Sequence, residues 1–368
     1  MKPQDNRLTG YGLSQRRFPA FKYLLQISLI AVALLLSYDS RPSMAAQEAI
    51  TGEWIIDTRP GTDYIKLTIR RGGGRHFNMS TVDVRQESIK GLSQAMAAGP
   101  GSPVQFQIVR DAGTLNCEGW FKEGKGSGNF TFVPDQSFVS EMNGLGYHNL
   151  SGEKTFSMAV LDVSRAFVRD LSALGYGRLP IDDLIAMRIH GATPQFINEL
   201  KAAGYDRLPA DQLIAMRIHG VTPEFIREVN ASGYERPQVD QLVAMRIHGV
   251  TPDFMKEIQA LGYTRPPIDQ LVAMRIHGVK GEFMKELQEL GYDRVPIDHL
   301  IAMRIHGVRT EFIKELKTLG YDRVPVDQLV AMRIHGVDGA FIQKARERGF
   351  KDLSIDELVN LRIHGLDK

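Results

Sequence analysis

The fold of this chain is decided by a short stretch that recurs at a constant interval, Met245-Arg246-Ile247-His248-Gly249. The same five residues begin at positions 187, 216, 245, 274, 303 and 332, and the variant Leu361-Arg362-Ile363-His364-Gly365 closes the series. Each step is 29 residues long, without insertion. Constant periods of about 20 to 50 residues are typical of repeat proteins, in which each unit packs only against its neighbours.

A second motif has the same period and begins with a phenylalanine, at positions 138, 167, 196, 225, 254, 283, 312 and 341. One period before Met187 stands Met158, in a copy that keeps the apolar positions but loses Arg, His and Gly. A degenerate first copy is expected of a capping repeat, because its outer face meets something other than another repeat. We therefore predict about eight units over residues 138–368.

Each unit contains the pattern of two short helices. In the first helix, Ile268, Leu271, Val272 and Ile276 fall at i, i+3, i+4 and i+8, which predicts one shared apolar face. Gly278 then suits the left-handed position that ends a helix. In the last unit, Ser354 and Glu357 have the spacing of a capping box at the helix start.

The second helix of a unit is predicted to begin at Thr222-Pro223, because Thr is a good N-cap and Pro fits the first turn. Phe225, Ile226 and Val229 make its apolar face. A hairpin of two helices this short cannot bury both faces alone, so neighbouring units must stack. The sequence therefore predicts an α-helical repeat array of the α-solenoid type.

Residues 47–137 have a different pattern, with short β-branched and aromatic runs at Trp54–Ile56, Tyr64–Ile69, Val104–Val109 and Asn129–Val133. Gly, Pro and Asp separate the runs, which predicts a small antiparallel sheet or open barrel. The segment Lys125–Gly128 is predicted to be the turn of a hairpin. A short helix is predicted around Gln86–Ala97. The fold class is thus α+β multidomain, with a small antiparallel β domain followed by the helical repeats.

Residues 1–46 have the pattern of an export signal. A basic stretch ends at Lys22, an apolar run covers residues 23–37, and small residues follow at Ser43–Ala46. The apolar run is shorter than the roughly 20 residues of a spanning helix. We therefore predict an exported protein of the periplasm or cell surface. The alternative is an uncleaved anchor, with residues 23–37 in the inner membrane as the only membrane contact.

Charge argues against nucleic acid as a partner. The whole chain has a formal charge of +2, but residues 1–46 hold six basic and two acidic side chains, so the remainder is weakly acidic. Binding to a phosphate backbone requires a basic surface. Cys117 is the only cysteine, so no intrachain disulfide can form, and we expect a buried, inert thiol.

The repeated histidines suggest either a metal-binding ladder or a structural role at a helix end. They are His190, His219, His248, His277, His306, His335 and His364. Each precedes a glycine at the end of a predicted helix, where an imidazole interacts favourably with the last carbonyls and the helix dipole. Metal sites need converging ligands, whereas one histidine per stacked unit gives a row. We therefore predict the structural role and no metal or cofactor.

The repeated arginines recur with a set of aspartates six residues earlier in each helix. The arginines are Arg188, Arg217, Arg246, Arg275, Arg304, Arg333 and Arg362, and the aspartates are Asp182, Asp211, Asp240, Asp269, Asp298, Asp327 and Asp356. Six residues is too far for pairing within one helix. We predict ion pairs between neighbouring units that fix their stacking.

Motifs of known enzyme classes are not found in the sequence. There is no zinc-peptidase H-E-x-x-H, no nucleophile elbow and no P-loop. We therefore expect a protein that is not an enzyme and acts through a protein partner. An alternative is a β domain that binds a ligand or carries out catalysis, held on a repeat scaffold.

The repeat text from Asp240 to Phe254 resembles uncharacterised repeats at the carboxyl ends of bacterial membrane metallopeptidases of the β-lactam-sensor type. It is also similar to repeats in related exported proteins, and the similarity covers about residues 50–368. The peptidase domain and its zinc motif are not present in this sequence, so peptidase activity does not transfer. The resemblance implies an envelope location and an interaction role, with regulation or inhibition of such a peptidase or sensor as an alternative.

Two further segments resemble known folds. Gly52-Glu53-Trp54 is similar to the first strand of lipocalin-like barrels, although this region is too short for an eight-stranded one. The stretch from Ile218 to Pro223 resembles the turn of DNA-binding helix-hairpin-helix modules, with Thr222 in place of their second glycine. Export and the weakly acidic remainder favour a hairpin of that geometry without a DNA role.

Overall fold

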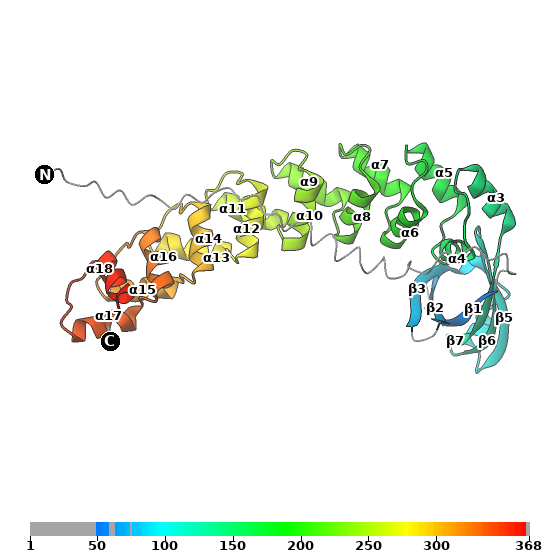
Figure 1. The fold of residues 1–368 in the computed structure, drawn as a ribbon, viewed down its shortest axis with the longest axis horizontal. Coiled ribbons are helices and arrows are strands. Elements are labelled where there is room, and N and C mark those ends of the chain that lie inside the picture. Colours follow the sequence, from blue (N-terminus) through cyan, green and yellow to red (C-terminus); the bar gives the residue numbers. More distant parts are fainter. Residues whose placement is uncertain (1–48, 59–62, 74–75, 366–368) are drawn as a thin grey trace. The chain divides into compact units, whose positions relative to one another are not determined.

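The computed structural model describes residues 49–58, 63–73 and 76–365, and its backbone divides into two compact units between Arg165 and Ala166 (Figure 1). The predicted signal sequence or anchor, residues 1–46, lies outside the described residues. Within the described ranges, no helix combines the length and the apolar composition needed to cross a membrane.

The amino-terminal unit is built on a curled antiparallel sheet of seven strands, in the order β3-β2-β1-β7-β6-β5-β4. The strands are β1 (Ile50–Thr58), β2 (Tyr64–Gly73), β3 (His76–Arg85), β4 (Ile89–Lys90), β5 (Ser102–Arg110), β6 (Gly113–Lys122) and β7 (Lys125–Pro134). This unit also contains the helices α2 (Gln94–Ala98), α3 (Gln136–Gly144) and α4 (Gly152–Val160). The predicted antiparallel β domain is thus confirmed.

One face of the sheet is apolar because side chains alternate along each strand. Trp54 and Ile56 of β1 are fully buried on this face, whereas Glu53, on the opposite face, is exposed. The Trp54 ring stacks on Phe121 at 5.8 Å and meets Phe106 edge-on at 4.9 Å between ring centroids. Its indole NH donates to the carbonyl oxygen of Asn129 at 3.0 Å. This aromatic cluster is the centre of the core.

Helix α4 covers this core and belongs to the degenerate first copy of the repeat. It contacts β1, β6 and β7, and its Phe156 ring stacks on Phe130 at 5.6 Å. The copy that lacks the Arg, His and Gly of its successors therefore packs on a sheet, as expected of a repeat whose outer face meets a different structure.

Three details of the β domain differ from the sequence predictions. Strand β3 was not predicted, and the helix predicted around Gln86–Ala97 is instead a 3-10 turn, the short β4 and the five-residue α2. The hairpin between β6 and β7 exists, but its turn is Glu123-Gly124, with φ of 50° and 83°, because Lys122 pairs with Lys125. The segment Lys125–Gly128 lies within β7.

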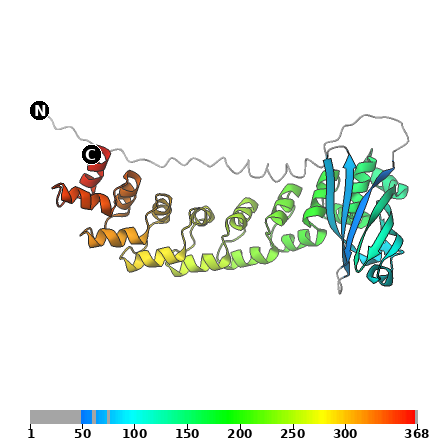
Figure 2. The same ribbon diagram turned by 90° about the horizontal axis from the view of Figure 1, so that it is seen from below.

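The carboxyl-terminal unit alternates two sets of short helices. The first set is α6 (Ile181–His190), α8 (Ala210–Ile218), α10 (Val239–His248), α12 (Ile268–Ile276), α14 (Ile297–Ile305), α16 (Val326–His335) and α18 (Ile355–Ile363). The second set is α5 (Arg165–Ala173), α7 (Pro194–Ala202), α9 (Pro223–Ala231), α11 (Pro252–Ala260), α13 (Gly281–Glu289), α15 (Thr310–Thr318) and α17 (Gly339–Glu347). From α6 onwards, consecutive members of the first set contact one another, as do those of the second set from α7, which gives the two rows of Figure 2.

The helix ends follow the sequence signals. Thr222 Oγ1 accepts a hydrogen bond from the Phe225 NH at 3.2 Å, and Ser354 forms the predicted capping box with Glu357. Gly249 lies in the left-handed region at φ 70°. The next residue, Val250, donates its NH to the Met245 carbonyl at 2.8 Å, which is the bond of a Schellman motif.

Replacing Gly249 by valine is expected to lower the free energy of unfolding by about 1 kcal/mol or more, because a β-branched residue does not readily adopt a left-handed backbone. A Cβ here would also lie 3.2 Å from the Arg275 guanidinium. The measurement is the midpoint of urea unfolding. Gly144→Ala is the control, since Gly144 lies outside the left-handed region and a Cβ there meets nothing within 4 Å. Equal midpoints for the two variants would contradict the cap assignment.

The predicted apolar face of the first helix is correct at Ile268 and Leu271 but wrong at Ile276, which is 52% exposed. Helix α12 ends at Ile276, and the inward positions near its end are taken by Met274 and, after the glycine cap, by Val279. Both are fully buried. Ile276 follows Met274 by two residues, which is roughly 200° around the helix, so it lies on the side opposite the buried Leu271 and Met274.

Candidate functional site

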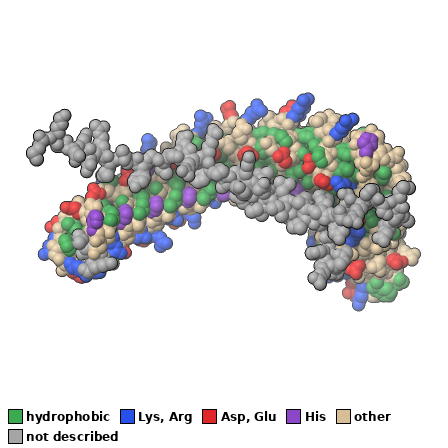
Figure 3. All heavy atoms as spheres, in the orientation of Figure 1, with side chains coloured by type: hydrophobic (Ala, Val, Ile, Leu, Met, Phe, Trp, Pro, Cys, Tyr) green, Lys and Arg blue, Asp and Glu red, His purple; other side chains and the backbone are tan. Residues whose placement is uncertain are grey.

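The most regular exposed feature of the repeats is a row formed by the last isoleucine of every first helix and the histidine after it. The isoleucines are Ile189, Ile218, Ile247, Ile276, Ile305, Ile334 and Ile363, with exposed fractions from 41% to 53%. We call them, with His190, His219, His248, His277, His306, His335 and His364, the Ile–His row. Figure 3 shows histidines alternating with apolar side chains along the helices of this unit.

Helical geometry explains why this isoleucine is exposed. In α10, Leu242 and Met245 are fully buried and define the inward side. Ile247 follows Met245 by two residues, which is roughly 200° around a helix of 3.6 residues per turn, and it therefore lies on the opposite side. It is 41% exposed. The same arrangement returns in each unit because the sequence of this helix is nearly unchanged.

The histidines occupy the helix ends as predicted, but none of the seven side chains makes a hydrogen bond to another described residue. Half-burial lowers the pKa of His190 and of His219, by removing water from around the imidazole. Among the described residues, no group of three or more His, Cys, Asp or Glu side chains is placed to hold a metal ion. The row therefore places imidazoles beside isoleucines without an acidic partner.

The repeated arginines join neighbouring units, though not through the predicted ion pairs. The Arg217 guanidinium lies 5.0 Å from the centroid of the Phe196 ring, and its Nε donates to the His190 carbonyl at 3.3 Å. It thus contacts both helices of the preceding unit. The other pairs, at 5.0 to 5.3 Å, are Arg188–Phe167, Arg246–Phe225, Arg275–Phe254, Arg304–Phe283, Arg333–Phe312 and Arg362–Phe341.

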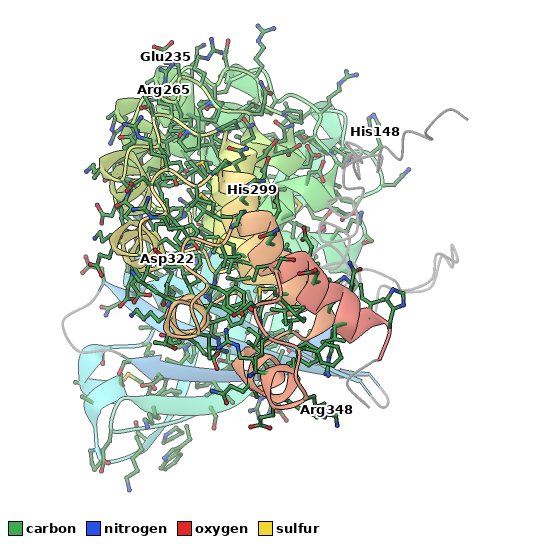
Figure 4. The ribbon with its side chains drawn as sticks, turned by 90° about the vertical axis from the view of Figure 1, so that its left-hand side faces the viewer. His148, Glu235, Arg265, His299, Asp322 and Arg348 are labelled. Atoms are coloured by element: carbon green, nitrogen blue, oxygen red, sulfur yellow. The ribbon has the colours of Figure 1, made fainter. Side chains whose placement is uncertain are left out.

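The prediction that these arginines pair with the repeated aspartates is wrong for Arg217, Arg246, Arg275, Arg304 and Arg333. Among the described residues, none of these five guanidinium groups has a carboxylate within 4.0 Å. Arginine stacks well on an aromatic face, which is the contact it makes here. Aspartates do contact the preceding unit, through other partners: Gln328 donates to Asp356 at 3.1 Å, and His299 (labelled in Figure 4) lies 3.5 Å from Asp327.

A second set of contacts between units is formed by the tyrosines of six Gly-Tyr pairs, which the sequence did not single out. The Tyr205 hydroxyl donates to the Pro237 carbonyl at 2.7 Å. The equivalent bonds, at 2.7 to 2.8 Å, are Tyr176–Leu208, Tyr234–Pro266, Tyr263–Val295, Tyr292–Val324 and Tyr321–Leu353. Each bond spans 32 residues and so ties one unit to the next.

Alkaline pH is expected to weaken these tyrosine bonds. Burial raises the pKa of Tyr205 to about 12, and it also raises the pKa of Tyr176, Tyr234, Tyr263 and Tyr292. A phenol with a folded-state pKa above its unfolded value of about 10 contributes stability that is complete below pH 10. That stability is lost as the pH rises towards the folded-state pKa. Urea midpoints, followed by circular dichroism, should therefore fall between about pH 10 and 12.

Tyr205→Phe is the matched variant for this titration. It removes both the titrating hydroxyl and the bond to Pro237, so its midpoint should start lower at pH 8 and decline less steeply above pH 10. Parallel declines in the two proteins would show that other groups cause the alkaline loss.

The loops between units contain arginines whose backbone is in the left-handed region, which the sequence did not predict. Arg178, Arg207, Arg236, Arg265, Arg294 and Arg323 have φ between 45° and 60°. Arg236 donates to the Gly204 carbonyl at 2.7 Å, and Arg265, labelled in Figure 4, donates to Gly233 at 3.2 Å. These contacts position the loops. Together with the tyrosine bonds and the contacts between arginines and phenylalanine rings, they hold successive units in one register.

Cys117 is buried, as predicted, and burial raises the pKa of its thiol to about 12. Thiolates, not thiols, are the nucleophiles, so this side chain is unreactive in the folded protein.

Comparisons with known protein families, with curated proteins and with solved structures find no match to this chain.

Proposed function

We propose that this chain is a non-enzymatic interaction protein of the bacterial cell envelope, and that its repeats stack as an α-solenoid presenting the Ile–His row to a protein partner. The observation that carries the proposal is the exposure of the same isoleucine in seven units, between 41% and 53%. The export pattern of residues 1–46 supports the location.

The residues found at equivalent positions of the seven units support a role beyond folding for the Ile–His row. Another exposed or partly exposed position, immediately before the second helix, varies from unit to unit, with Thr251, Lys280, Arg309 and Asp338. The isoleucine is the same in all seven units. It gains little from burial, and a β-branched residue is not a strong helix former. A solvent-exposed position would tolerate polar residues, so the repeated isoleucine favours an apolar contact surface.

The composition of the row fits a protein partner better than an ionic ligand. Isoleucine supplies apolar area at each unit, and imidazole has both an apolar ring and polar nitrogens. Burial lowers the pKa of His190 and of His219, which disfavours a positive charge on these two side chains. Rows of equal chemistry at regular spacing allow one extended partner to make several similar contacts.

Site-specific photo-crosslinking tests this proposal. A photoreactive residue is placed at Ile276 in the row and, as the control, at Lys285, an exposed position on the second helix. Envelope fractions of the source cell are then irradiated with each protein. We expect a discrete crosslinked protein from position 276 and none from position 285. Equal crosslinking at both positions, or none at position 276, would overturn the proposal.

A further inference from the structure

The outer face of the sheet holds a shallow depression of about 560 Å³ that the repeats do not explain. It lies over β5, β6 and β7, and Lys90 and Gly91 stand at its edge. Its polar side chains project from alternate positions of these strands, namely Gln105, Gln107, Asn116, Glu118, Asn129 and Thr131. These polar side chains are four amides, the Thr131 hydroxyl and the Glu118 carboxylate, on the face opposite the aromatic core.

Strand register arranges these side chains in two rows across the sheet. Gln107, Asn116 and Thr131 lie opposite one another on the three strands. Gln105, Glu118 and Asn129 form the neighbouring row. Side chains opposite each other in a sheet are roughly 5 Å apart, and successive rows on the same face are roughly 7 Å apart. The face thus presents a lattice of hydrogen-bonding groups.

One pair in this lattice is already oriented. Gln107 Nε2 donates to Asn116 Oδ1 at 2.7 Å. That bond leaves the carbonyl oxygen of Gln107 as an acceptor and the amide nitrogen of Asn116 as a donor. No other hydrogen bond to a described residue occupies these two side chains. An acceptor and a donor held side by side match the paired hydroxyls of a sugar ring.

An exposed aromatic residue stands beside the depression. Trp120 lies two positions from Glu118 on the same face of β6, and 53% of it is exposed. The other tryptophan, Trp54, is fully buried in the core. The Trp120 indole lies over Gly101, where a Cβ would stand 3.1 Å from its Nε1, so a side chain at that position would displace it. The ring is a flat apolar surface next to polar rows.

We propose that this face binds a neutral oligosaccharide, with a sugar ring stacked on Trp120 and its hydroxyls bonded to the amide rows. Sugar rings have one apolar C–H face and a rim of hydroxyls, which matches an aromatic ring beside amides. Among the described residues that line the depression, Lys90 and Glu118 are the charged ones, and they are opposite in sign. The volume falls within the usual range of ligand sites, about 300 to 1,000 Å³. This site belongs to the amino-terminal unit and does not depend on the Ile–His row.

Tryptophan fluorescence gives a direct test, because the chain has only two tryptophans and one of them is buried. The full chain is titrated with the tetrasaccharides of glucose and of N-acetylglucosamine, both β-1,4-linked, and with a sulfated oligosaccharide for contrast. We expect a saturable change in emission, and protection from iodide quenching, with at least one neutral tetrasaccharide. No saturable response to either neutral tetrasaccharide, or a response to the sulfated one alone, would overturn the proposal.

Variants on the two parts of the site complete the test, with binding followed by calorimetry. Trp120→Ala and Asn116→Leu should each weaken binding by about tenfold or more, as expected for removing an aromatic anchor or its polar partner. Met79→Ala is the matched control, since Met79 is 62% exposed on β3, away from the depression. All three should keep the circular dichroism spectrum of the parent. Unchanged affinity in both site variants would place any binding elsewhere.

Discussion

Replacing Trp54 by alanine is expected to lower the free energy of unfolding of the amino-terminal unit by about 3 to 5 kcal/mol, the usual effect of removing a large aromatic side chain from a core. Trp54 has no exposed surface, and its ring contacts Phe106 and Phe121. The variant also leaves the carbonyls of Glu118 and Asn129 without the indole donor. Domains of this size are stable by only about 5 to 15 kcal/mol, so this loss is a large fraction of the total stability.

Urea unfolding followed by far-ultraviolet circular dichroism measures this effect without relying on tryptophan emission. Trp120→Ala is the matched control, because it removes the same atoms from a residue that is 53% exposed. Its cost should stay below about 1 kcal/mol. Comparable losses in the two variants would contradict the assignment of Trp54 as the centre of the core.

The helical unit could be predicted from sequence because its signals are local. Thr222 caps the start of α9, and Gly249 takes the left-handed position at the end of α10. Each signal acts within about five residues. The glycine recurs in seven units at a 29-residue step, whereas Lys280 and Arg309 replace the capping threonine in two of them without a side-chain cap. Local propensity, helix ends and periodicity therefore agree in most units, which is the condition under which a sequence specifies one fold.

Contacts between units could not be predicted in the same way, because they depend on which atoms stacking brings together. Arg217 and Asp240 carry opposite charges, yet Arg217 is found on the Phe196 ring and at the carbonyl of His190. A guanidinium can satisfy either partner, and sequence alone does not give the distance between them. The hydrogen bond from Tyr205 to Pro237 could not be predicted either, because every residue has a backbone carbonyl and the sequence does not show which one a tyrosine will reach.

In the β domain, glycine was misread because it has two uses in a sheet. Lys125–Gly128 contains two glycines and was predicted as a turn, yet both lie in β7. A Cβ on Gly126 would collide with the Phe121 ring, and one on Gly128 would collide with the backbone of Glu118. These glycines permit close packing between strands. The sequence did not single out Trp120, because only its outward position in the strand register shows that it lies beside the amide rows.

Replacing Ile247, Ile276 and Ile305 together by aspartate is expected to abolish partner binding, with an affinity loss of about 100-fold or more. The three side chains occupy successive units of the Ile–His row, and each is at least 41% exposed. Burying a carboxylate against an apolar partner without a counter-charge is strongly unfavourable. Because these positions contribute little to the core, the free energy of unfolding should change by no more than about 0.5 kcal/mol per site.

The matched control replaces Lys256, Lys285 and Lys314 by aspartate, on the second helices of the same three units. This variant changes the net charge by twice as much as the isoleucine variant. If general charge repulsion governed binding, the lysine variant would therefore bind more weakly. Binding retained in the lysine variant and lost in the isoleucine variant would locate the contact on the row. Binding that survives in the isoleucine variant would instead mean that the exposed isoleucines serve no partner, and the function would have to be sought in the amino-terminal unit.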